Sequence, residues 1–105
     1  MWTTIIIDDE QLARQRIKRL ISNYPEIKVI AEAENGAEGL LKIEELRPQL
    51  IFLDIEMPIL NGFEMLDKLT HQPKVVFTTA YDQYAIKAFD EGSIDYLLKP
   101  IELDR

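Results

Sequence analysis

Residues 50–62 have the sequence Leu-Ile-Phe-Leu-Asp-Ile-Glu-Met-Pro-Ile-Leu-Asn-Gly. The first four are apolar and make a run of strand length that ends at an acid, Asp54. Pro58 and the pair Asn61-Gly62 then predict a loop over residues 55–62. This stretch therefore predicts a buried strand that delivers a carboxylate into a loop.

Similar apolar runs alternate with helical patterns along the rest of the chain. Strands are predicted at residues 3–7, 27–33, 50–53, 74–78 and 94–98. Apolar residues recur at helical spacing over residues 12–21, 37–46, 63–69 and 84–89, and Asn35 with Glu38 and Asn61 with Glu64 have capping-box spacing. The alternation predicts one α/β domain over residues 1–105, a doubly wound parallel sheet in the order 2-1-3-4-5.

Composition narrows the class of protein. The formal net charge of the 105 residues is −7, which disfavours nucleic-acid binding by this domain. There is no cysteine, which excludes a disulfide scaffold, a zinc–thiolate site and a thiol nucleophile. No apolar run approaches the roughly 18 residues of a membrane span, and the N-terminus lacks the basic region of a secretory signal. We therefore expect a cytoplasmic protein that does not insert into membranes.

Polar residues follow the central strands where each one ends. Three acids, Asp8, Asp9 and Glu10, follow the first strand. Asp54 ends the third, Thr79 ends the fourth and Lys99 ends the fifth. The carboxyl ends of parallel strands share one edge, where ligands bind. Carboxylates gathered there need a positive counter-ion, and Mg²⁺ prefers such oxygen ligands. Zn²⁺ would want histidine or cysteine, and the single histidine is predicted on a loop.

A carboxylate beside a divalent cation can attack phosphorus and form an aspartyl phosphate, with an ammonium and a hydroxyl pairing the phosphoryl oxygens. Each residue also has an ordinary structural explanation. Asp8 and Asp9 could cap a helix, Asp54 could be a turn acid, Thr79 could bond to the backbone, and Lys99 could be a solvated lysine. Their arrival together at one edge of the predicted sheet favours phosphoryl transfer.

The same residues resemble a known family. Ile-Asp-Asp-Glu at 7–10, Phe-Leu-Asp-Ile-Glu-Met-Pro at 52–58, Asn61-Gly62, Thr79-Ala80 and Lys99-Pro100 are similar, in this order, to the receiver domains of bacterial two-component response regulators. The resemblance covers essentially the whole chain. Residues 76–82, 84–89 and 95–101 more narrowly resemble regulators with a LytTR-type DNA-binding domain.

The resemblance implies a flavodoxin-like fold and a metal-dependent phosphoacceptor. Asp54 would accept the phosphoryl group and would also be one of the Mg²⁺ ligands. Asp9 would bind Mg²⁺ directly, Asp8 would assist through water, and the backbone carbonyl of Glu56 would complete the protein ligands. The domain would act in signalling, with only self-phosphorylation and autodephosphorylation as its own chemistry.

The resemblance also assigns residues near the fourth and fifth strands. Lys99 would hold the phosphoryl group and be followed by a cis peptide bond to Pro100. Thr79 and Tyr96 would form the conformational switch, although Tyr96 could equally be a half-buried strand aromatic. The side chains of Glu56 and Tyr81 would influence the lifetime of the phosphoryl group.

Partners follow from the same resemblance. A sensor histidine kinase would donate the phosphoryl group, and an output domain, expected to be of the LytTR type, would lie outside this chain. The basic residues of the first predicted helix could dock the kinase or form a solvated face; they are Arg14, Arg16, Lys18 and Arg19. The family's fifth helix is expected to be missing or truncated after Lys99, which would leave an apolar face beside the fifth strand for a homodimer.

Two other functions stay open from the sequence. A small aspartyl-phosphate phosphatase would use similar residues, but such enzymes place an aspartate where Glu56 stands and carry a lid that this chain is too short to hold. A phosphorylation-independent interaction module would lack some of the acceptor, acid-pair or lysine residues, and all are present here.

Overall fold

The computed structural model of the chain describes residues 1–79 and the backbone of residues 95–98. The strands are β1 (Trp2–Ile7), β2 (Ile27–Ala33), β3 (Leu50–Asp54), β4 (Lys74–Thr79) and β5 (Asp95–Leu98). The helices are α1 (Gln11–Ile21), α2 (Gly36–Leu46) and α3 (Gly62–Asp67). These bounds lie within about two residues of the predicted ones. The helix predicted at residues 84–89 falls outside the described residues.

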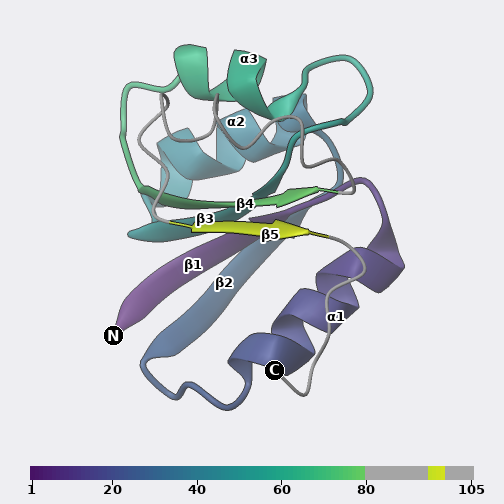
Figure 1. Cartoon of the computed structure of the whole chain (residues 1–105). Coiled ribbons are helices and arrows are strands. Elements are labelled where there is room, and N and C mark those ends of the chain that lie inside the picture. The colour runs from purple at the N-terminus through teal and green to yellow at the C-terminus, as the bar shows by residue number, and fades with distance from the viewer. Residues whose placement is uncertain (80–94, 99–105) are drawn as a thin grey trace.

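The strands form one parallel sheet in the order β2-β1-β3-β4-β5. Helices α2 and α3 cover one face of the sheet, and α1 covers the other (Figure 1). The predicted α/β parallel architecture is therefore confirmed. The predicted loss of a fifth helix concerns residues 99–105, outside the described part of the chain.

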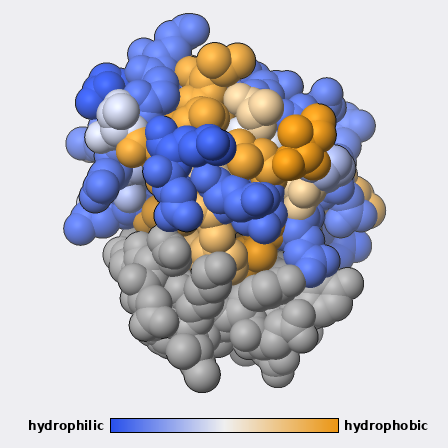
Figure 2. Space-filling model, turned by 90° about the horizontal axis from the view of Figure 1, so that it is seen from above, coloured by the Kyte–Doolittle hydropathy of each residue, from blue (hydrophilic) through white to orange (hydrophobic). Residues whose placement is uncertain are grey.

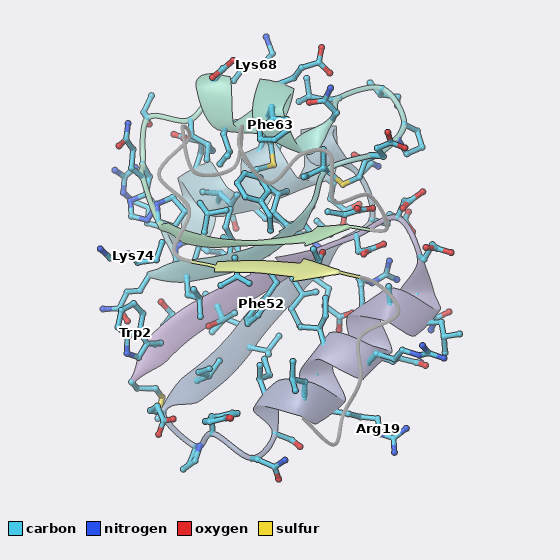
Figure 3. The ribbon with its side chains drawn as sticks, viewed as in Figure 1. Trp2, Arg19, Phe52, Phe63, Lys68 and Lys74 are labelled. Atoms are coloured by element: carbon cyan, nitrogen blue, oxygen red, sulfur yellow. The ribbon has the colours of Figure 1, made fainter. Side chains whose placement is uncertain are left out.

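Apolar side chains fill both sides of the sheet. Under α2 and α3, the ring of Phe63 tilts against that of Phe77, with 5.1 Å between ring centroids. On the other face, Ile17 of α1 packs with Phe52 of β3. Figure 3 shows Phe63 and Phe52 on these opposite sides. Both faces of β3 are buried, which explains why its sequence is apolar without alternation.

The two predicted capping boxes differ. Asn61 accepts a hydrogen bond from the Glu64 backbone N–H, and the Glu64 carboxylate accepts one from the Asn61 N–H, both at 2.9 Å. Asn35 accepts from the Glu38 N–H at 2.8 Å. The Glu38 carboxylate, however, pairs with Lys42 at 3.0 Å, one turn further along α2. The capping box at α3 is confirmed. At α2 only the bond to the Asn35 side chain forms, because the Glu38 carboxylate pairs with Lys42 instead of the Asn35 N–H.

The surface above α2 and α3 mixes apolar patches with charged side chains (Figure 2). Two of the exposed apolar residues are Leu41 on α2 and Ile59, whose side chain is 87% exposed, on the loop before α3. Within the described ranges, none of the helices has the length and apolarity needed to cross a membrane.

Candidate functional site

A buried polar layer lies at the carboxyl edge of the sheet. The α1 face carries an apolar layer of side chains paired across three neighbouring strands: Ile6, Phe52 and Val76. The next positions with the same alternation are Asp8, Asp54 and Thr78. These side chains are buried, with exposed fractions of 0%, 4% and 0%. The register pairs Asp54 of β3 with Thr78 of β4. It also pairs Ile7 of β1 with Leu53 of β3, and the next residues along these two neighbouring strands are Asp8 and Asp54.

Asp8 is held firmly in the turn between β1 and α1. Its backbone N–H donates to the Ala33 carbonyl at 3.0 Å, and its Oδ1 accepts from the Glu10 N–H at 2.9 Å. Its own carbonyl accepts from Nη1 of Arg14 at 2.7 Å. The N-cap of α1 is Glu10, which makes no side-chain capping bond. Asp8 and Asp9 are therefore not the cap of α1.

Three consecutive acids form a candidate cation site in this turn. One carboxylate oxygen from each of Asp8, Asp9 and Glu10 lies within 4.8 Å of the other two. Asp8 is buried, whereas Asp9 and Glu10 are exposed to incoming solvent and ions. Hard oxygen donors of this kind fit Mg²⁺, which keeps several of its own waters. The cluster contains Glu10, which the sequence places beside the acid pair but which was not among the predicted metal ligands.

Asp54 reaches the same edge from β3, and the start of α3 packs against its backbone. The Gly62 N–H donates to the Ile55 carbonyl at 2.8 Å. A Cβ on Gly62 would lie 2.7 Å from the Asp54 carbonyl oxygen, so only glycine permits this approach. Within the loop, Ile59 has a φ of 72°, a left-handed conformation that is costly for a β-branched residue. Glu56, whose carbonyl is a predicted metal ligand, is exposed.

Basic residues of α1 face the acidic turn and β2. Arg14 Nε and Lys18 Nζ both pair with the Glu32 carboxylate, at 3.1 and 2.6 Å. The hydrogen bond from Lys18 is the main cause that lowers the pKa of Glu32 below its ordinary 4.5; Arg14 adds to it and partial burial opposes it. Arg14 and Lys18 are thus engaged within the fold, while Arg19 is exposed and points away from the sheet (Figure 3).

The remaining predicted site residues are only partly described. Thr79 is the residue after Thr78 and pairs with Leu98, and Tyr96 pairs with Phe77, in each case by backbone register. The side chains of Thr79 and Tyr96, and all of Tyr81 and Lys99, lie outside the described residues. Their roles in phosphoryl binding, switching and lifetime stay predictions.

His71 lies far from this edge, in the connection between α3 and β4. Its Nε2 is 2.5 Å from the Pro48 carbonyl oxygen. The prediction that this histidine sits on a loop is confirmed. Among the described residues, the acidic turn is the cluster with metal-ligand spacing.

Comparison with known proteins identifies the family. The model of the response regulator receiver domain matches residues 4–105. An uncharacterized response regulatory protein of Vibrio cholerae is 47% identical over 107 residues, covering all of this chain and 45% of the relative. The transcriptional regulatory protein BtsR of Escherichia coli K12 is 45% identical over 104 residues, covering 97% of this chain and 44% of BtsR. The chain thus spans less than half the length of these relatives.

Solved structures agree with this assignment. The response regulator domain of Thermotoga maritima CheB superposes with a TM-score of 0.85 at 32% identity, covering 98% of this chain and 84% of that domain. The response regulatory domain of mrkE from Klebsiella pneumoniae gives a TM-score of 0.86 at 32% identity, covering 98% and 87%. The chain belongs to the response regulator receiver domain family and is the receiver domain of a two-component response regulator.

Proposed function

We propose that Asp54 is the residue that accepts the phosphoryl group. The observation that carries this proposal is the buried polar layer of Asp8, Asp54 and Thr78 beside the acidic turn. Asp54 is 4% exposed at the carboxyl edge of a central strand. An acid that only stabilises a turn is seldom so deeply buried. The position of Asp54 suits an acceptor beside a cation site.

The transfer that follows is a displacement at phosphorus. A carboxylate oxygen of Asp54 attacks the phosphorus of a phosphohistidine on the kinase and forms the O–P bond. The P–N bond breaks, and its electron pair stays on the imidazole, which then takes a proton. When bound, Mg²⁺ would neutralise charge on the phosphoryl oxygens. Asp8 and Asp9, with the Glu56 carbonyl, would hold the ion, and Glu10 adds a third carboxylate nearby.

Residues beyond the described part complete the proposal. Lys99 would pair with a phosphoryl oxygen, the Thr79 hydroxyl would donate to another, and Tyr96 would change its position in response. Support comes from their places along the sheet: Thr79 is in β4, which pairs with the strand of Asp54, whereas Tyr96 lies within β5 and Lys99 follows it, one strand further along.

The longer protein would use this domain as a switch. We propose a sensor histidine kinase as phosphodonor, in the cytoplasm, and a LytTR-type DNA-binding output domain that controls transcription. The relatives named transcriptional regulatory protein BtsR, more than twice as long as the matched region, support a transcriptional output. Self-association beside β5 stays a prediction, which sedimentation at high protein concentration would test.

The direct test is phosphorylation by acetyl phosphate with Mg²⁺, followed by intact mass spectrometry. Wild type should gain one phosphoryl group, and chelation of the metal should abolish the gain. Asp54→Asn should gain none, whereas Asp67→Asn, which changes an exposed acid of α3, should behave as wild type. An equal adduct on Asp54→Asn would refute the assignment. Repeated turnover of small phosphomonoesters would instead favour the phosphatase.

A further inference from the structure

Arg14 occupies an unfavourable position for a cation. It lies in the first turn of α1, where the helix dipole disfavours positive charge. Its side chain is nonetheless only 13% exposed, although arginine is rarely buried without partners. Specific interactions must therefore offset the cost of holding it there.

The guanidinium group makes two charge-assisted contacts in different directions. Nη1 donates to the Asp8 carbonyl at 2.7 Å, and Nε donates to Oε1 of Glu32 at 3.1 Å. Glu32 is held in turn by Lys18, at 2.6 Å, and the Lys42 ammonium donates to the Glu32 backbone carbonyl. Because the guanidinium is planar and rigid, fixing Nε on β2 also fixes the direction of Nη1.

The carbonyl that Arg14 binds belongs to the peptide bond between Asp8 and Asp9. A peptide unit is planar, so a bond to its oxygen fixes the orientation of the whole unit. The Asp8 N–H is already anchored on Ala33, and its side chain on the Glu10 N–H. Arg14 therefore adds a further anchor to this turn, on the peptide unit from which the exposed Asp9 carboxylate leaves the backbone.

We propose that Arg14 is a positioning residue for the metal site, orienting the Asp8–Asp9 peptide through its Nη1 while Glu32 orients Arg14. This inference rests on the proposed function, because it takes Mg²⁺ to bind at the acidic turn. Arg14 does not touch the ion; it acts through the backbone that carries the ligands.

Charge and positioning predict opposite effects when Arg14 is neutralised. A cation beside the acidic turn repels Mg²⁺, so loss of its charge alone would tighten metal binding. Loss of a positioning contact loosens the ligands, and removal of such outer partners typically weakens metal binding about 10–100-fold. The sign of the change in the dissociation constant therefore separates the two roles.

The experiment is a calorimetric titration of the metal-free chain with Mg²⁺ alone. Arg14→Met should raise the dissociation constant by about tenfold or more. Arg14→Lys, which keeps the charge but lacks the planar fork, should also raise it. The matched control is Lys18→Met, which removes an equal charge from the same Glu32 but leaves the Asp8 carbonyl bond, and it should bind Mg²⁺ as tightly as wild type or more tightly.

Amide hydrogen exchange of the metal-free variants gives a second readout. Arg14→Met should expose the N–H groups of residues 8–10 to faster exchange while β3 stays protected. Unchanged or tighter Mg²⁺ binding in folded Arg14→Met would overturn the proposal. If that variant fails to fold, Glu32→Gln replaces it and should weaken Mg²⁺ binding. An unchanged Mg²⁺ dissociation constant in Glu32→Gln would then contradict the proposal. Wild type that binds no Mg²⁺ would instead refute the proposed function.

Discussion

Substitution of Gly62 tests how the start of α3 shapes the backbone of Asp54. In Gly62→Ala, the new methyl carbon would lie 2.7 Å from the Asp54 carbonyl oxygen and 3.2 Å from Ile55 Cα. Ordinary contact begins at 3.4 Å, so one of the two backbones must move by about 0.7 Å. Both contacts are with backbone, which cannot yield by a change of rotamer.

The expected cost follows from this crowding. Overpacking of a well-filled site lowers the unfolding free energy by about 1–3 kcal/mol. The better helix propensity of alanine offsets at most about 1 kcal/mol of this loss. Gly62→Ala should therefore lose about 1–2 kcal/mol of unfolding free energy. Because misplacement of a reacting group by about 1 Å can cost about 100-fold, phosphorylation of Asp54 should slow by about tenfold or more.

The matched control is Gly39→Ala on α2. There the added carbon would lie 3.1 Å from the Ile7 Cδ1 and Cγ2 methyls and from Met65 Sδ, so only side-chain atoms, and no backbone, would have to give way by a few tenths of an ångström. Gly39→Ala should keep the stability of wild type within about 0.5 kcal/mol or exceed it. Urea unfolding followed by circular dichroism and the rate of adduct formation with acetyl phosphate measure both effects. A Gly62→Ala variant equal to Gly39→Ala in both assays would refute the steric reasoning.

Three further outcomes are expected. Because the pKa of Glu32 is lowered, its ionised form stabilises the fold above pH 4.5, and this contribution is lost as the pH falls through the lowered pKa. In urea unfolding, Glu32→Gln should therefore be less stable than wild type at neutral pH, and the two unfolding free energies should become equal at acid pH. Ile59→Asn, which tolerates the φ of 72°, should gain about 1 kcal/mol in thermal unfolding, unlike Ile59→Val. The buried Thr78 hydroxyl has no hydrogen-bond partner among the described residues, so Thr78→Val should gain about 1 kcal/mol; a loss would reveal a partner.

Much of the fold was predictable because its elements depend on local patterns. Residues 27–33 form the predicted strand without adjustment, since an apolar segment of strand length with Ile27, Val29 and Ile30, bounded by loop residues, needs little context. The parallel order follows from alternation of strands and helices. The capping box at α2 was predicted incorrectly in part, because the sequence pattern does not show that Lys42 competes for Glu38.

The site was predictable to the extent that it follows strand ends. Asp8, Asp9 and Asp54 reach one edge because parallel strands end together. Glu10 was predicted at this edge but not as a metal ligand, because the motif pattern assigns that role to the acid pair before it. The contact of Arg14 with the Asp8 carbonyl could not be predicted, because it depends on the side-chain direction of a helix packed across Glu32 of an edge strand. Such a contact depends on how the helix packs in three dimensions, and no periodic pattern in the sequence indicates it.

The most direct test of the central claim is chemical mapping of the acceptor. The chain is phosphorylated with acetyl phosphate and Mg²⁺, the acyl phosphate is reduced with sodium borohydride to the alcohol, and the digest is sequenced by mass spectrometry. The account predicts homoserine at position 54 and at no other acid. Homoserine at Asp8 or Asp9 with an intact Asp54 would contradict it.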